Sequence, residues 1–186
     1  IVSTGATYDD EIQKSVDILN KSDVNFSLLH CVTIYPTQLK QFHLSRMQIL
    51  KKMADSIGFS DHSLVARDGI KGSLCAIYLG AEIIERHFTV LKANETKDGP
   101  VSINKKQLKY ISEFGNLSKE DQLLHLNELK INIKELEGDK IRFLSEEELL
   151  NRDYYRGRFI NRSNNKIVFN WEDSARELLN DSGANQ

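Results

Sequence analysis

Polar and ionisable side chains recur in this sequence at the points where short apolar runs end. Hydroxyl groups can hold a phosphate or a carboxylate, and neutral imidazoles can hold a divalent metal. The residues in question are Ser3-Thr4 after the first run, Thr33 and Tyr35 after the second, Ser60 and His62 at the third, and His87 at the fourth. These residue types predict anion- and metal-binding chemistry, provided that the fold brings them together.

The apolar runs themselves predict how the fold would do this. Four runs, at residues 1–4, 26–32, 56–60 and 81–89, alternate with longer segments of helical apolar spacing. Strand and helix alternating in this way are typical of βαβ units and a parallel sheet, hence of an α/β fold. Right-handed crossovers place the carboxyl ends of all strands at one edge, where α/β folds keep their chemistry.

His62 and His87 are the candidate metal ligands on this reasoning. Neighbouring parallel strands lie about 4.8 Å apart, so imidazoles at adjacent strand ends could share one ion despite their distance in sequence. The alternatives are ordinary structural roles. A histidine at a strand end is commonly a hydrogen-bonding loop residue, Ser3 and Thr4 could cap a helix, and Asp98 lies in Lys97-Asp98-Gly99-Pro100, which has a turn signature. Spacing alone leaves both interpretations open.

Several helices are expected between and after the strands. Thr7 could cap the first helix, and Asp68 could cap the one that precedes the fourth strand. Helical spacing places apolar residues on single faces at Ile12-Val16-Leu19, at Leu44-Met47-Leu50-Met53 and, within a helix over 120–136, at Leu123-Leu126-Leu129-Ile133-Leu136. A further helix is expected over 107–117, a hairpin or extended arm over 152–172, and frayed chain over 182–186.

Composition excludes several classes of protein. The 186 residues are 40% apolar and 28% charged, with a net charge of −2. There is no basic footprint for nucleic acid, and the apolar runs are too short to span a membrane. Cys31 and Cys75 lack the spacing of a redox or zinc motif, so we expect reduced core thiols in a cytoplasmic protein.

Five segments of the chain carry a resemblance to a known family. The segments are "IVSTGAT", "LLHCVTIYPT", "GFSDHS", "LGAEIIERHFTV" and "KDGPVSI", which span roughly residues 1 to 114. In order and spacing they resemble the second half of the sialic acid synthase family, which includes legionaminic and pseudaminic acid synthases. The most specific pieces are His-Cys-Val-Thr-x-Tyr-Pro-Thr, Ser-Asp-His and Glu-Arg-His-Phe-Thr.

The resemblance implies a TIM-type (β/α)8 barrel, of which this chain supplies about strands five to eight. It implies residues 1–117 as that half barrel, and we expect 118–150 to be an amphipathic helical segment and 151–186 an extended arm or linker. The reaction implied is the condensation of phosphoenolpyruvate with an N-acylated hexosamine such as N-acetylmannosamine, with loss of phosphate. The cofactor implied is a divalent metal, Mn²⁺ or Mg²⁺.

The resemblance also assigns roles to residues. His62 and His87 match the metal ligands, and Ser3 and Ser60 match residues that hold phosphoenolpyruvate. The remaining matches are Thr33, which faces the same ligand, and Tyr35 and Asp98, which lie near the sugar and the metal and are the catalytic candidates. The turn before Asp98 reads Thr96-Lys97 and departs from the family's commoner Gly-Pro.

The family's phosphoenolpyruvate-binding lysines and its acid/base glutamate would belong to strands one to four. We therefore expect this chain to be inactive alone, to need the missing N-terminal half as a partner, and to form a homodimer when full length. Two alternatives remain. One is an inactive relative that acts as a binding or assembly module, and the other is a different metal-dependent TIM-barrel aldolase.

Overall fold

The computed structural model describes residues 1–141, 143–157, 160–163 and 166–169. The chain divides into two compact units, Ile1–Leu144 and Ser145–Gln186. Every candidate site residue predicted from the sequence belongs to the first unit, so each unit is described by itself.

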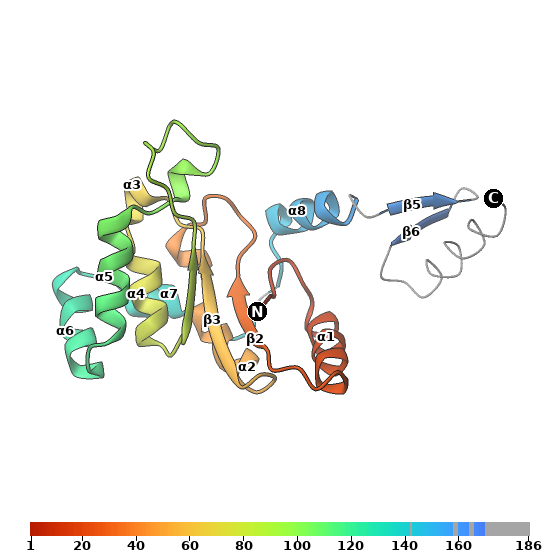
Figure 1. Ribbon diagram of the computed structural model, residues 1–186, viewed down its shortest axis with the longest axis horizontal. Helices are drawn as coiled ribbons and strands as arrows, with labels where there is room; N and C mark the ends of the chain where they lie inside the picture. The colour runs from red at the N-terminus through yellow and green to blue at the C-terminus, as the bar shows by residue number, and fades with distance from the viewer. Residues whose placement is uncertain (142, 158–159, 164–165, 170–186) are drawn as a thin grey trace. The chain divides into compact units, whose positions relative to one another are not determined.

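The first unit is built on a four-stranded parallel sheet (Figure 1). The strands are β1 (Val2–Ser3), β2 (Ser27–Cys31), β3 (Ser56–Asp61) and β4 (Ile83–Arg86), and they lie in the order β1-β2-β3-β4. Each strand pairs with the strand next to it in sequence. The predicted α/β fold with a parallel sheet is confirmed, and all carboxyl ends reach one edge.

Strand alternation separates two kinds of side chain onto the two faces of the sheet. Leu28, Ile57 and Phe59 point to one face and belong to the main hydrophobic cluster. Ser60 follows Phe59 directly, so its side chain points to the other face. Cys31 and Glu85 are the partners of Ser60 in register and share that face. We call the first face the core face and the second the polar face, because the second carries Ser60 and Glu85, although Leu29 and Ile83 also lie on it.

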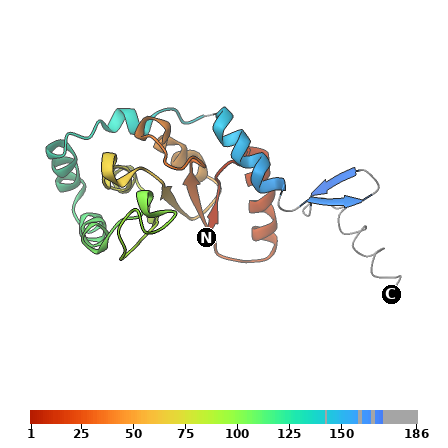
Figure 2. The same ribbon diagram turned by 90° about the horizontal axis from the view of Figure 1, so that it is seen from above.

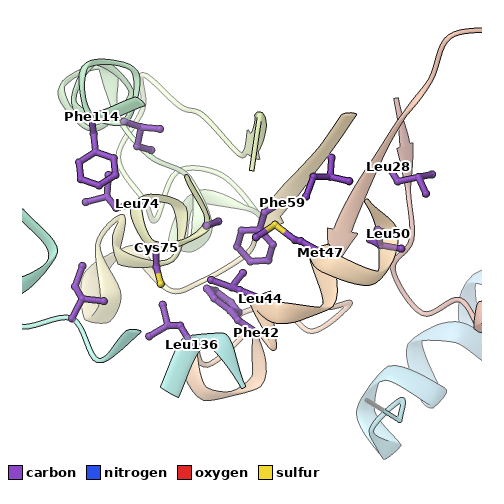
Figure 3. Packing of buried hydrophobic residues seen from close by; sticks show 14 of the residues in the cluster. Leu28, Phe42, Leu44, Met47, Leu50, Phe59, Leu74, Cys75, Phe114 and Leu136 are labelled. Atoms are coloured by element: carbon purple, nitrogen blue, oxygen red, sulfur yellow. The ribbon is translucent and has the colours of Figure 1, made fainter. Parts of the chain in front are cut away.

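Helices of the first unit cover the core face (Figure 1, Figure 2). Their apolar side chains interlock with those of the sheet, and Phe42 and Phe59 meet edge to face with ring centroids 4.9 Å apart (Figure 3). The helical elements of the first unit, in chain order, are α1 (Asp9–Lys21), η1 (Leu39–Gln41), η2 (Leu44–Arg46), α2 (Met47–Leu50), α3 (Val65–Asp68), α4 (Lys71–Tyr78), η3 (Gly99–Val101), α5 (Lys105–Gly115), α6 (Lys119–Glu128) and α7 (Ile133–Glu137).

Two helix caps differ from the sequence prediction. Thr7 does not cap α1, because its hydroxyl donates to the Gly5 carbonyl at 2.8 Å. The N-cap is Tyr8, whose backbone N–H donates to the Glu11 carboxylate at 2.9 Å. Asp68 ends α3 instead of starting α4, whose N-cap is Ile70.

Two expected helices are broken by residues with left-handed backbone. His43, with φ 48°, separates η1 from η2, so the helix expected after Pro36 becomes two 3-10 turns and the short α2. Lys130, with φ 51°, separates α6 from α7. The expected apolar stripe is therefore only partly buried: Leu126 and Leu136 lie in the core, whereas Leu123 and Leu129 are exposed.

The second unit contains α8 (Glu146–Gly157) and an antiparallel pair of strands, β5 (Ile160–Ser163) and β6 (Lys166–Phe169). Antiparallel pairing of residues 160–163 with 166–169 agrees with the expected hairpin, whereas residues 152–157 are helical. The prediction of frayed chain over 182–186 lies outside the described residues. Within the described ranges, every helix is too short or too polar to cross a bilayer.

Candidate functional site

His62 and His87 lie together at the carboxyl ends of β3 and β4. Their ring centroids are 5.4 Å apart, with the ring planes at 68°. The backbone of each histidine is fixed by a hydrogen bond beyond its strand, since the His62 carbonyl accepts from Thr37 N at 3.0 Å and the His87 carbonyl from Ile103 N at 2.8 Å. The proximity expected from strand register is confirmed.

Tyr35 packs against this histidine pair. Its ring centroid lies 4.1 Å from that of His62 and 6.4 Å from that of His87. Tyr35 is 46% exposed, whereas His62 is only 3% exposed. The tyrosine therefore forms an accessible wall beside two imidazoles, which suits a residue that contacts a substrate.

The environment of His62 keeps its imidazole neutral. Burial, and after it the neighbouring His87, lowers the pKa of His62 from 6.5 to about 4. The Cys31 thiol lies beside this ring, with Sγ 3.9 Å from His62 Nδ1. A neutral imidazole is the form that binds metals, so His62 is available as a ligand throughout the physiological pH range.

Ser60 and Glu85 form a second polar pair, and each stands two residues before one of the histidines. They are direct partners in register, and Ser60 Oγ donates to Glu85 Oε1 at 2.7 Å. Sequence reasoning missed Glu85 as a site residue. The signal was present, because Glu85 lies in the fourth predicted strand, two positions before His87, and strand alternation turns two such side chains to one face.

The remaining hydroxyl candidates lie on the β1 and β2 side of the sheet. Thr33 is buried, and a Cβ added to Gly5 would lie 2.6 Å from Thr33 Oγ1. Ser3 is exposed and pairs with Leu29, whereas Ser60 pairs with Cys31. Ser3 therefore lies two residues, about 6.6 Å, further from the histidine edge than Ser60 does. The structure places Ser3 on the polar face but not against the histidines.

Asp98 reaches the site from the loop that follows β4. Its Oδ2 lies 3.8 Å from His87 Nδ1, and its side chain is 57% exposed. Asp98 immediately precedes η3, where Gly99 packs so closely that a Cβ there would lie 2.0 Å from the Ala93 carbonyl oxygen. The loop is therefore held tightly beside His87, and the expected turn carries a carboxylate close to a candidate ligand.

The two imidazoles fit a divalent ion in an open site. With metal–nitrogen bonds of about 2.1 Å, two imidazoles on one ion have ring centroids within about 6.5 Å of each other, and the observed 5.4 Å lies inside this limit. Among the residues that the structure describes, no three side chains of His, Cys, Asp or Glu are arranged as a metal-binding group. The described chain therefore offers two protein ligands and leaves further coordination positions for water or substrate.

A comparison with protein families matches residues 1–120 to the NeuB family. This range contains all the residues of the site described above.

Several curated relatives with similar sequences are named as synthases of nonulosonic acids. The chain is 37% identical over 115 residues to the N,N'-diacetyllegionaminic acid synthase of Campylobacter jejuni, which covers 60% of this chain and 33% of the relative. It is 32% identical over 115 residues to the N-acetylneuraminate-9-phosphate synthase of Drosophila melanogaster, covering 60% and 30%. With the pseudaminic acid synthase of Helicobacter pylori it shares 29% identity over 173 residues, covering 90% and 48%. The chain thus spans about a third to a half of these relatives.

Solved structures with the same fold agree with this relationship. The N-acetylneuraminic acid (sialic acid) synthetase of Leptospira borgpetersenii, in complex with citrate, matches with a TM-score of 0.54 and 30% identity over 84% of this chain and 48% of that chain. The Bacillus subtilis spore coat polysaccharide biosynthesis protein spsE matches in fold, with a TM-score of 0.62 and 24% identity over 87% and 44%.

Proposed function

This chain belongs to the NeuB family, and from that membership we propose that it supplies the metal-binding half of a nonulosonic acid synthase. The proposed reaction joins phosphoenolpyruvate to an N-acylated hexosamine and releases phosphate. The observation that carries the proposal is the pair of imidazoles of His62 and His87, 5.4 Å apart at the carboxyl edge of a parallel sheet. Sites at this edge are the rule in parallel α/β folds.

His62 and His87 are the proposed ligands of a divalent cation, Mn²⁺ or Mg²⁺. When bound, such a cation supplies Lewis acidity that polarises the aldehyde oxygen of the sugar. In both rings Nδ1 faces a neighbour of its own, Cys31 Sγ at 3.9 Å and Asp98 Oδ2 at 3.8 Å. This arrangement favours Nε2 as the ligating nitrogen in each ring, since the partner at Nδ1 fixes the ring orientation.

The hydroxyls of the polar face are the proposed contacts to phosphoenolpyruvate. Ser60 is nearest to the histidines, Thr33 follows β2, and Ser3 lies in β1. In the reaction the enol carbon attacks the aldehyde carbon, the carbon that carried the phosphate takes up water, and phosphate leaves with the bonding electrons. Neutral hydroxyls can hold the anion without leaving an unpaired buried charge when the site is empty. Tyr35 and Asp98 are proposed to contact the sugar, since both lie beside the histidine pair.

The rest of the active site is proposed to come from another half of the barrel. The described sheet has four strands, and the chain spans a third of the length of its C. jejuni relative. Eight strands are needed to close a barrel of this type. We expect the phosphoenolpyruvate-binding lysines and the acid/base glutamate in the complementary half, and a homodimer for the complete protein.

The test joins this chain to the N-terminal half of the C. jejuni N,N'-diacetyllegionaminic acid synthase. The product, called the joined protein below, is assayed for phosphate release from phosphoenolpyruvate with N-acetylmannosamine and other N-acylated hexosamines. We expect Mn²⁺-dependent release, abolished by EDTA and restored by the metal. Activity that survives complete removal of metal would contradict the assigned site.

Matched substitutions locate the activity in this chain. His62→Gln and His87→Gln remove the proposed ligands, and His125→Gln on α6 is the control because His125 lies away from the sheet edge. We expect the rate of phosphate release to fall at least 100-fold in the first two variants and to stay unchanged in the control. An active His62→Gln/His87→Gln double variant would rule out the proposed metal site.

A further inference from the structure

The residues that immediately precede the two histidines form a buried ion pair. Asp61 stands before His62 at the end of β3, Arg86 stands before His87 at the end of β4, and the two are partners in register. The Arg86 guanidinium contacts the Asp61 carboxylate, and their side chains are 2% and 0% exposed. Because side chains alternate along a strand, the pair lies on the core face while the histidines lie on the polar face.

Among the described residues, the Asp61 carboxylate accepts hydrogen bonds from Ser63, which follows His62, and from Ser73 in α4. Oδ1 accepts from the backbone N–H of Ser63 at 2.9 Å and from Ser63 Oγ at 2.8 Å. Oδ2 accepts from Ser73 Oγ in α4 at 2.7 Å. Asp61 therefore closes the backbone turn that contains His62 and ties it to the helix below.

Arg86 holds the same turn from the neighbouring strand. Its Nη1 donates to Ser63 Oγ at 2.8 Å, and its Nη2 donates to the Ser63 carbonyl at 2.9 Å and to the Gly69 carbonyl at 3.3 Å. The residues on both sides of His62 are thus bonded to the residue that directly precedes His87. These side-chain bonds add to the backbone pairing of Asp61 with Arg86 in the β3–β4 ladder.

We propose that the buried Asp61–Arg86 pair is a positioning device that sets the distance and angle between the His62 and His87 imidazoles. The part of this proposal that concerns metal binding rests on the function proposed above. The part that concerns the positions of the two rings does not depend on that function. The planar guanidinium is suited to this task because it reaches the Asp61 carboxylate and the Ser63 turn at once, which a lysine ammonium cannot do with fixed geometry.

A purely stabilising ion pair would behave differently. Replacing both members of a buried pair by apolar residues of similar volume is often neutral or favourable for stability, whereas removing one member leaves a buried charge unpaired. The stability of the fold and the geometry of the rings can therefore be separated by experiment. If the proposal is correct, a variant without the pair can still fold, but its two imidazoles no longer have the original distance and angle.

The experiment uses the 186-residue chain with two variants. Arg86→Lys keeps the positive charge but removes the planar guanidinium, and Asp61→Leu/Arg86→Met removes both charges. The control, Glu82→Gln, breaks the Lys51–Glu82 ion pair at the opposite end of β4. Folding is checked by circular dichroism. The first readout is the nuclear Overhauser effect between the ring protons of His62 and His87 in metal-free protein, with His62→Gln and His87→Gln used to assign the signals. The second readout is the affinity for Mn²⁺, measured by electron paramagnetic resonance.

We expect the folded variants to lose the ring-to-ring Overhauser effect and to bind Mn²⁺ about 10- to 100-fold more weakly, as is typical when groups behind metal ligands are changed. The control should match the unmodified chain in both readouts. Folded variants that keep the Overhauser effect and bind Mn²⁺ within twofold of the unmodified chain would overturn the proposal. So would loss of fold in both variants, which would assign the pair to stability alone.

The two readouts distinguish this proposal from the proposed function. If the unmodified chain shows the ring-to-ring Overhauser effect but binds no Mn²⁺, the metal site fails, and the Overhauser comparison still decides whether the ion pair positions the rings.

Discussion

Ser60 and Glu85 face each other across β3 and β4, and the Ser60 hydroxyl donates a hydrogen bond of 2.7 Å to the Glu85 carboxylate. The proton of the serine is thus directed at the Glu85 carboxylate. In the proposed function an anionic substrate would compete with Glu85 for this proton, so we expect the pair to influence how tightly and where the anion binds.

Ser60→Ala is expected to weaken the binding of phosphoenolpyruvate to the joined protein about tenfold. This is the size of effect that follows the loss of one hydrogen bond to a charged group. Calorimetric titration with phosphoenolpyruvate measures it. Ser15→Ala on the exposed side of α1 is the control, because Ser15 bonds only within its own helix. Equal affinities in the two variants would remove Ser60 from the binding site.

The free energy of unfolding is expected to depend on pH through His62. Its pKa is lowered in the folded chain from 6.5 to about 4, chiefly by burial. The unfolded chain therefore binds more protons between these values, so His62 costs nothing above about pH 6.5 and destabilises the fold progressively as the pH falls to about 4. The full contribution is about 3 kcal/mol.

Urea unfolding at a series of pH values measures this effect. Carboxylates also titrate in the same window, so the informative quantity is the difference between variants. His62→Gln should show a slope between pH 4 and 6.5 that is shallower than that of the unmodified chain by about one proton. Parallel curves for the unmodified chain and His62→Gln would show that the imidazole is not held neutral by the fold.

Gly58→Ala is expected to destabilise the first unit by about 3 kcal/mol, at the upper end of the usual cost of overpacking. A Cβ at this position would lie 2.4 Å from the Ile83 carbonyl oxygen and 2.5 Å from Leu29 Cδ2. The backbone oxygen cannot move without separating β3 from β4, the two strands that carry the histidines. Thermal or urea unfolding checks the prediction.

The control for this substitution is Gly115→Ala at the end of α5, where an added Cβ meets nothing within 4 Å. Alanine stabilises helical positions relative to glycine by about 0.5–1 kcal/mol, so this variant should equal or exceed the unmodified chain in stability. If Gly58→Ala were as stable as Gly115→Ala, the close contact between the strands would be refuted.

Tyr35 is expected to act through its ring as well as its hydroxyl. Tyr35→Phe keeps the ring that lies 4.1 Å from His62, whereas Tyr35→Ala removes it. We expect Tyr35→Phe to bind Mn²⁺ as the unmodified chain does and to raise only the KM for the sugar. Tyr35→Ala should weaken both. The comparison uses Mn²⁺ titration and steady-state kinetics of the joined protein, and equal metal affinity in Tyr35→Ala would exclude a supporting role for the ring.

Much of the architecture could be predicted from the sequence because the strands are short, apolar and separated by regular distances. In the apolar run Phe26–Val32, Leu28, Leu29 and His30 are all buried. His30 is a core residue, with Nε2 2.6 Å from the Phe42 carbonyl oxygen. The meeting of His62 and His87 followed from the rule that parallel strands end at one edge.

Contacts distant in sequence explain what could not be predicted. The helix expected after Pro36 breaks at His43, whose Nδ1 accepts from Asp139 N at 3.1 Å, and Ser45 Oγ donates to the Glu137 carbonyl at 2.9 Å. No local pattern contains a partner so far along the chain. Glu85 and the Asp61–Arg86 pair were missed for another reason. Their residues stood inside recognised segments, but their partners depend on strand register, which is a property of the folded sheet.

The sequential order β1-β2-β3-β4 makes this region autonomous in one respect. The residues paired between β3 and β4 are 25 positions apart in sequence. The spacing of the two imidazoles is therefore set between elements that are close in the chain, within the half of the barrel that this chain is proposed to supply.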